Sequence, residues 1–91
     1  MMRRDWKHLQ NETAAAQLSF LDTEVKTGLT FARLALKARD AGKVSRNLLN
    51  ARKAYETITA YLANVPAQTR ELAGIREKLK TLQEMIQALE K

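Results

Sequence analysis

The side chains that could support catalysis or bind a metal are few and scattered in this sequence. His8 is its single histidine, and the chain contains no cysteine. A zinc site takes three or four ligands, and Asp5 and Glu12 beside His8 are too few to complete one. A Ser–His–Asp arrangement needs a group that orients the histidine, and His8 has none that the sequence identifies. We therefore predict that His8 is a surface residue and that the chain holds no metal.

The carboxylates also indicate structure and not catalysis. Glu77 and Glu84 flank a leucine-rich stretch, where charged residues normally border a helix–helix interface. Glu56 and Glu71 do not belong to the Glu-x-x-His pattern of di-iron bundles. The three glycines are scattered and form no phosphate-binding loop. We expect a protein that is not an enzyme, with no cofactor and no small-molecule substrate.

The net charge of +6 is concentrated in one stretch of the chain. Seven basic residues and a single acid, Asp40, lie between Arg33 and Lys53, while acids and bases balance in the rest of the sequence. We take the following residues as a candidate patch for an anion or an acidic partner: Arg39, Lys43, Arg46, Arg52 and Lys53. A helix that starts at Ser45 would add its N-terminus to Arg46, Lys43 and Arg39, forming a tip that accepts anions.

Three interpretations of this basic stretch are open. A cluster of charges is most often a solvated surface, which is the simplest of the three. The stretch could also bind an acidic protein or peptide. A pI near 10 is typical of nucleic-acid binders, but aromatic residues make up only 5% of the chain and do not alternate with basic residues as a stacking surface requires.

The elements that must position these residues are helices. In 91 residues, 45% are hydrophobic, and only three Gly and one Pro occur, which argues against a turn-rich β fold. Apolar residues recur at spacings of three and four and predict helices at about 18–41, 45–63 and 67–89. The predicted core seams are Leu18, Leu21, Val25, Leu29, Ala32, Leu36 and Arg39 in the first helix, Leu48, Ala51, Tyr55, Ile58, Leu62 and Val65 in the second, and Leu72, Ile75, Leu79, Leu82, Ile86 and Leu89 in the third. Links of three residues force neighbouring helices to be antiparallel. The expected fold is an all-α, up-down-up three-helix bundle over 18–91, with 1–17 as an N-terminal arm or helix extension.

The sequence also predicts where each helix begins and ends and what one internal glycine does. Gly42 would end the first helix, and Ser45 would cap the second. Asn64 could end the second helix, and either Asn64 or Thr69 could cap the third. Gly28 lies on the flank of the first apolar seam, between Val25 and Leu29, where it would permit a close approach between helices. The alternative is a break at Gly28, which would give four helices.

Large apolar residues outside the three seams suggest an interaction surface. The candidates are Trp6, Phe20, Phe31, Leu34, Leu49 and Tyr61. Contiguous exposed apolar patches mark interfaces, and self-association would cover such a patch as well as a partner would. In the alternative interpretation the N-terminal arm folds back and covers these residues.

Part of the chain resembles known helical families. The segment Asn50–Ile58 (NARKAYETI), with Ala51 and Tyr55 four residues apart, is similar to the second helix of tetratricopeptide-type hairpins and of microtubule-interacting and trafficking domains. The latter are three-helix bundles whose Ala-rich first helix ends near an Asp and a Gly, and Ala35, Ala38, Asp40 and Gly42 match that pattern.

The likeness extends from Phe31 to Leu89, and its third helix corresponds to Leu72–Leu89. It implies a groove between helices that accepts a partner's amphipathic helix. The stretch from Asp40 to Tyr55 is about three residues longer than in that family, Trp6 has no counterpart, and no 34-residue repeat is present. The segments GLTFARLAL and NARKAYETI also resemble short bacterial helical-bundle proteins, which imply no function.

The expected location is the cytoplasm. No apolar run approaches the roughly 20 residues that a membrane span needs. Asp5, Lys7 and His8 interrupt any secretory signal after the basic start of the chain. The expected partner is a protein or a second copy of this chain, with nucleic acid as the less favoured alternative and no membrane.

Overall fold

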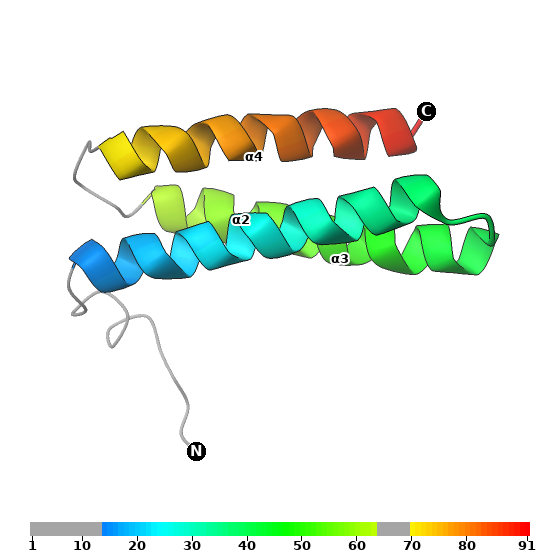
Figure 1. The fold of residues 1–91 in the computed structure, drawn as a ribbon, viewed down its shortest axis with the longest axis horizontal. Helices are drawn as coiled ribbons and strands as arrows, with labels where there is room; N and C mark the ends of the chain where they lie inside the picture. Colours follow the sequence, from blue (N-terminus) through cyan, green and yellow to red (C-terminus); the bar gives the residue numbers. More distant parts are fainter. Residues whose placement is uncertain (1–13, 64–69) are drawn as a thin grey trace, which may run out of the picture.

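The computed structural model describes residues 14–63 and 70–91, which form three α-helices. They are α2 (Ala14–Lys37), α3 (Ala41–Leu62) and α4 (Arg70–Leu89). The helices α2 and α3 form an antiparallel hairpin, and α4 runs in the direction of α2 (Figure 1). The prediction of an all-α, up-down-up three-helix bundle is confirmed. The residues Trp6, His8, Asn64 and Thr69 lie outside the described part of the chain.

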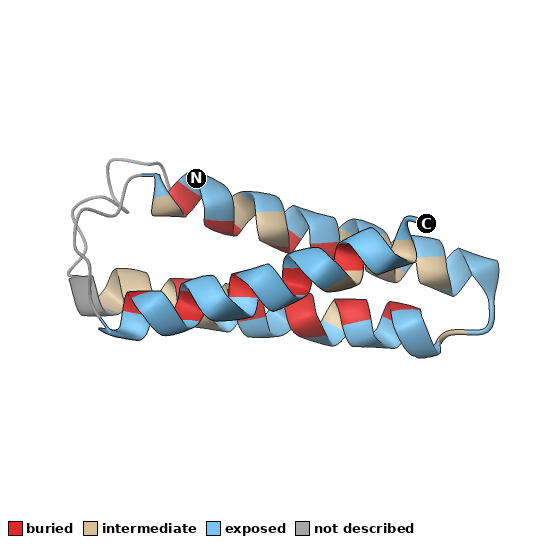
Figure 2. Ribbon diagram, turned by 90° about the horizontal axis from the view of Figure 1, so that it is seen from above, coloured by how far each residue is buried: buried red, intermediate tan, exposed pale blue. Residues whose placement is uncertain are grey.

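The core lies where α4 covers the groove between α2 and α3. Figure 2 shows α4 crossing this groove, with the buried positions on the inward sides of the helices. The apolar seam predicted for the last helix is confirmed, because five of its residues are buried: Leu72, Ile75, Leu79, Leu82 and Ile86. They pack with buried residues of the hairpin: Leu21, Val25, Leu29, Ala32, Ala51, Ile58 and Tyr61.

The buried face of α3 is rotated from the predicted one. Leu48, Tyr55 and Leu62 belong to the predicted seam but are only partly buried against the core. Ala54 and Tyr61, which lie outside that seam, are buried instead. The reason is that α3 packs against two helices: small residues such as Ala54 face α2, while the larger seam residues lie at the edge of the core.

Gly28 does not interrupt α2, so the alternative of four helices within the described residues is wrong. A Cβ atom at Gly28 would lie 2.8 Å from Cδ2 of Leu82 and 3.0 Å from Cβ of Ala54. Residues of α4 and α3 therefore meet α2 at the same position, and a side chain there would separate the helices. The predicted role of Gly28 in a close helix–helix approach is confirmed.

The turn between α2 and α3 lies earlier in the chain than predicted. The helix α2 ends at Lys37, and α3 begins at Ala41 with Asp40 as its N-cap. The Asp40 carboxylate accepts a 3.0 Å hydrogen bond from the backbone N–H of Lys43. Ser45 therefore does not cap α3, and Gly42 does not end α2. Gly42 lies in the first turn of α3 without a positive φ.

The hairpin extends beyond the C-terminal end of α4 (Figures 1 and 2). Gly28 is level with Leu82, and at 1.5 Å per residue Leu36 is level with the residue that follows α4. Leu36 belongs to the predicted core stripe, but no part of the helix α4 reaches it. Its side chain is 51% exposed, so its predicted burial is wrong.

Two ion-pair interactions connect α4 to the hairpin, one near its middle and one just after its last residue. Near the middle of α4, Lys78 contacts Asp22 of α2 at 3.3 Å, and Lys26 contacts the same carboxylate at 2.8 Å. After the end of α4, Arg52 of α3 donates a 2.6 Å hydrogen bond from Nε to Oε2 of Glu90. The first interaction joins α4 to α2 and the second joins it to α3, as its crossing in Figure 2 requires.

Candidate interaction surface

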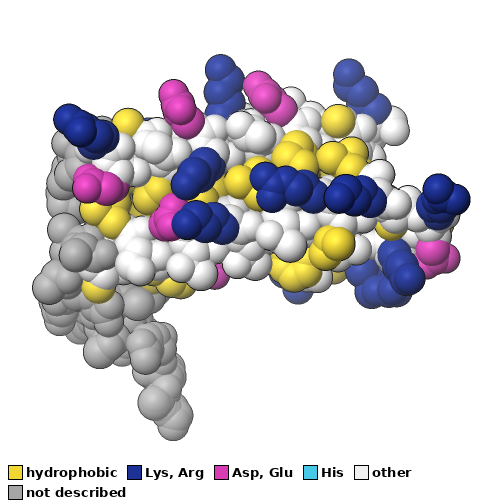
Figure 3. Space-filling view, in the orientation of Figure 1, with side chains coloured by type: hydrophobic (Ala, Val, Ile, Leu, Met, Phe, Trp, Pro, Cys, Tyr) yellow, Lys and Arg dark blue, Asp and Glu magenta, His cyan; other side chains and the backbone are white. Residues whose placement is uncertain are grey.

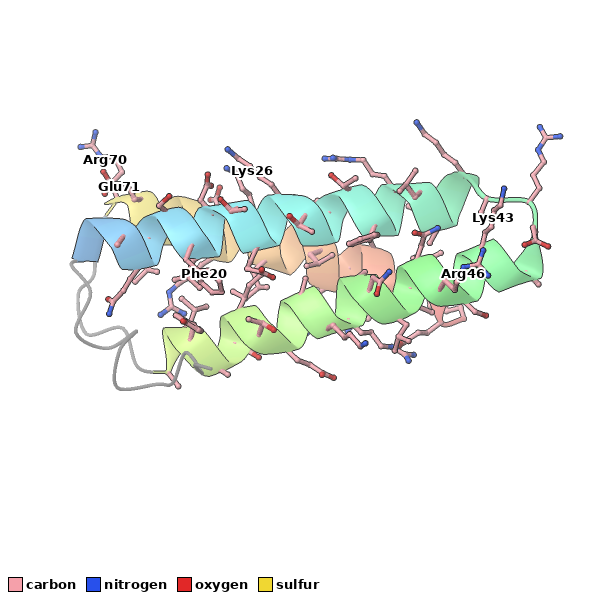
Figure 4. The ribbon with its side chains drawn as sticks, turned by 90° about the horizontal axis from the view of Figure 1, so that it is seen from below. Phe20, Lys26, Lys43, Arg46, Arg70 and Glu71 are labelled. Carbon is pink, nitrogen blue, oxygen red and sulfur yellow. The ribbon has the colours of Figure 1, made fainter. Side chains whose placement is uncertain are left out.

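The two groups of residues predicted to bind a partner meet largely on one side of the molecule. We call the side of the α2–α3 hairpin that faces away from α4 the open face. Figure 4 looks onto it, with Phe20 between the helices at one end and Lys43 and Arg46 at the hairpin end. Helical periodicity of about 100° per residue assigns the other members. The open face comprises Phe20, Glu24, Phe31 and Leu34 from α2, and Lys43, Arg46, Asn50, Lys53 and Tyr61 from α3.

The apolar part of the open face is closed at one end and exposed at the other. The Phe20 and Tyr61 rings have centroids 4.5 Å apart, and Tyr61 is only 7% exposed. These two residues hold α2 against α3 and belong to the packing between these helices, so the prediction of an exposed interface there is wrong. Phe31 is half-buried against the core, whereas Leu34, one turn further along α2, is 48% exposed.

The basic part of the open face is a stripe along α3. Lys43, Arg46 and Lys53 are spaced at i, i+3 and i+10, which places them on one side of a helix. All three side chains are exposed. Within residues 14–63 and 70–91, none of the three forms a salt bridge. The half-buried Asn50 lies between Arg46 and Lys53 in this stripe.

Two of the predicted basic residues lie elsewhere. Arg52 is next to Lys53 in sequence but is turned toward α4, where Glu90 neutralises it. Arg39 lies in the turn before α3 and is exposed. The predicted patch of five basic residues is therefore divided, with three on the open face, one in an ion pair and one at the turn.

The N-terminus of α3 is not a vacant anion site. The carboxylate of Asp40 occupies it through its hydrogen bond to the Lys43 N–H. Arg46 lies in the second turn of α3 and not at its start, and its guanidinium NH1 is 3.6 Å from the position of a Cβ on Gly42. The interpretation of Arg39, Lys43 and Arg46 as a tip around a free helix N-terminus is therefore wrong, because the chain supplies the anion itself.

Exposed leucines and uncompensated positive charge coincide at the hairpin end. Among the described residues, the large hydrophobic side chains that are exposed are Leu34, Leu36 and Leu49. All three lie within the stretch from Arg33 to Lys53 that carries the net charge of +6. Figure 3, which views the side of α2 and α4, also shows basic side chains gathered around this end with hydrophobic side chains between them. Leu36 is a surface residue that the sequence did not reveal, because its position in the apolar seam predicts burial.

A hollow lies between α2 and α4, away from the hairpin end. Leu18, Ser19 and Asp22 line one side of it, and Glu71, Gly74 and Lys78 line the other. Its charges are mixed, and Asp22 and Lys78 neutralise each other across it. Nothing in its lining selects one sign of charge or one chemical group.

The described residues offer no other arrangement with evident chemistry. In the part of the chain that the structure describes, no three His, Cys, Asp or Glu side chains gather closely enough to bind a metal ion. None of the three helices combines the length and the apolar character that a membrane span requires.

Comparison with known proteins adds no assignment. No family model matches the sequence, and no curated protein and no solved structure is significantly similar to it.

Proposed function

We propose that this protein is a non-enzymatic interaction module that binds another protein, or a second copy of itself, through the open face. The observation that carries this proposal is the combination of Phe31 and the half-exposed Leu34 with an unpaired basic stripe on the adjacent helix. Exposed apolar groups with polar residues around them are typical of protein interfaces. An interface accounts for the charges together with the exposed leucine on the neighbouring helix.

Site-specific photo-crosslinking in the host cell tests this proposal. A photoreactive phenylalanine analogue replaces Leu34 in one variant and Ala73 in another. Ala73 is exposed on α4, which lies on the other side of the hairpin, and it serves as the matched control. We expect a discrete protein adduct from position 34 and none from position 73. Equal labelling at both positions would contradict the proposal, whereas an adduct with a second copy of the chain would identify self-association.

The alternative function is nucleic-acid binding by the stretch from Arg33 to Lys53. The absence of ion pairs at Lys43, Arg46 and Lys53 within the described residues supports it. Phosphate contacts make affinity fall steeply with salt. Binding of a DNA or RNA duplex that weakens in this way, and that is lost on charge reversal of Lys43 and Arg46 but unaffected by Leu34→Glu, would favour this alternative.

A further inference from the structure

The charges of the open face distinguish between its possible occupants. Its described residues include three unpaired cations, Lys43, Arg46 and Lys53, and one carboxylate, Glu24. Glu24 lies toward the Phe20 end, whereas Lys43 and Arg46 lie with the exposed Leu34 at the hairpin end, and Lys53 lies near the middle of α3. The nearby Asp40 carboxylate is already engaged as the cap of α3. An occupant of this end must supply negative charge.

The spacing of the side chains on the open face sets a second requirement, which is that its occupant has an elongated apolar side. Phe31 and Leu34 on α2 and Arg46 and Lys53 on α3 are separated by about one to two helical turns along their helices, a length of roughly 5–10 Å. The two antiparallel helices carry these side chains along one elongated strip of surface. A third element that fits it is a helix whose apolar residues recur at i, i+3 and i+4.

We infer, on the basis of the proposed function, that the partner of the open face is an acidic amphipathic helix from another protein. Its apolar stripe lies on Phe31 and Leu34, and its flanking Asp or Glu side chains pair with Lys43, Arg46 and Lys53. The bound state is a four-helix arrangement in which the partner and α4 lie on opposite sides of the hairpin. A second copy of this chain fits less well, because two copies would bring the same unpaired cations toward each other. A nucleic acid would leave Leu34 without an apolar contact.

Selection from a library of displayed helical peptides tests this inference. Each peptide has leucines fixed at i, i+3, i+7 and i+10, and its flanking positions are drawn equally from Glu, Lys and Gln. The bait is the full chain at physiological salt. We expect the captured peptides to be enriched in Glu, and we expect the double variant Lys43→Glu and Arg46→Glu to capture Lys-rich peptides instead.

Two control variants separate the charge effect from general effects on the fold. Arg76→Glu with Lys80→Glu makes the same change in net charge on exposed positions of α4 and should leave the selected peptides rich in Glu. Leu34→Glu should weaken a captured acidic peptide at least about tenfold, because burial of a leucine accounts for that much affinity. Circular dichroism checks that each variant keeps its helix content.

The outcomes distinguish failure of the inference from failure of the proposed function. The inference of an acidic helical partner would be overturned if the captured peptides were not enriched in Glu. It would also be overturned if charge reversal at Lys43 and Arg46 did not change which peptides are captured. If light scattering then shows a dimer that Leu34→Glu dissociates, the proposed function stands with a second copy as the partner. If the chain stays a monomer and the crosslinker at position 34 gives no protein adduct, the inference and the proposed function both fail.

Discussion

Gly28 of α2 lies directly against Leu82 of α4, with 2.8 Å between Cδ2 of that leucine and the point that a Cβ on Gly28 would occupy. Because Leu82 is fully buried and Ala54 lies at 3.0 Å from the same point, neither neighbour has room to retreat freely. A side chain at Gly28 would overpack the site where the three helices meet.

The first prediction compares two glycines in helices. Gly28→Ala should lower the free energy of unfolding, because overpacking costs about 1–3 kcal/mol and the gain in helix propensity is only about 1 kcal/mol. Gly74→Ala should raise it by about 0.5–1 kcal/mol, because Gly74 is exposed within α4 and a Cβ there would meet no atom within 4 Å. Urea denaturation measures both, and equal effects of the same sign would contradict the packing at Gly28.

The second prediction concerns the start of α3. Asp40→Ala should destabilise the protein by about 1 kcal/mol, because it removes the acceptor for the Lys43 N–H. Ser45→Ala is the matched control, since Ser45 lies exposed inside α3 and should change stability by less than about 0.5 kcal/mol. Thermal denaturation of the two variants provides the comparison. A larger loss of stability from Ser45→Ala than from Asp40→Ala would indicate that Ser45 is the N-cap, as the sequence predicts.

The third prediction concerns the ion pair between Arg52 and Glu90. Their side chains are 45% and 38% exposed, so solvent screens the interaction despite its good geometry. A double-mutant cycle with Arg52→Ala and Glu90→Ala should give a coupling energy of at most about 1 kcal/mol, and the value should fall at high salt. A coupling of several kcal/mol would show that this end of α4 is held by more than a solvated pair.

The fourth prediction is a pH dependence that originates at Asp22. A hydrogen bond from Lys26 is the main cause that lowers the pKa of Asp22 below its ordinary value, and Lys78 adds to it, while partial burial acts in the opposite direction. A carboxyl whose pKa is lower in the folded chain contributes stability above its unfolded pKa of about 4 and loses it as the pH falls through the folded pKa.

Asp22→Asn should therefore be less stable than the parent chain at pH 6, and the difference should disappear in acid. The difference should be small, because the Asp22 side chain is 37% exposed. Urea titrations at pH 6 and below pH 3 measure it, with the exposed Glu77→Gln as a control of equal charge change. A difference that is the same at both pH values would exclude the ion-pair origin.

Regular apolar spacing made α4 predictable, since five of its six predicted seam residues are buried and Leu89, at its end, is half-buried. The spacing failed in α3, because Ala54 and Tyr61 face one neighbouring helix while Tyr55 and Leu62 lie nearer the edge of the core. A helix between two partners buries a wider arc than a single seam describes. Alanine is too small to signal that arc from its hydrophobicity.

The turn was displaced because Gly42 and Ser45 both satisfy local preferences for helix ends. Asp40 satisfies a stronger one, since its carboxylate reaches the Lys43 N–H. Several residues of the candidate surface were predicted from the sequence, but their arrangement on one side of the hairpin was not. Leu34 lies inside the basic stretch in sequence, but only the antiparallel hairpin places it on the same side as Arg46 of α3.

The course of α4 has a mechanical consequence. A helix laid diagonally over a hairpin and attached to α2 at Asp22 and to α3 at Arg52 resists shear, as a diagonal strut does in a frame. Sliding of α2 along α3 would have to pull one attachment apart or drag the buried leucines of α4 across Gly28. The packing of α4 across both helices therefore opposes a change in the register of α2 against α3, and the open face keeps the spacing between its leucine and its cations.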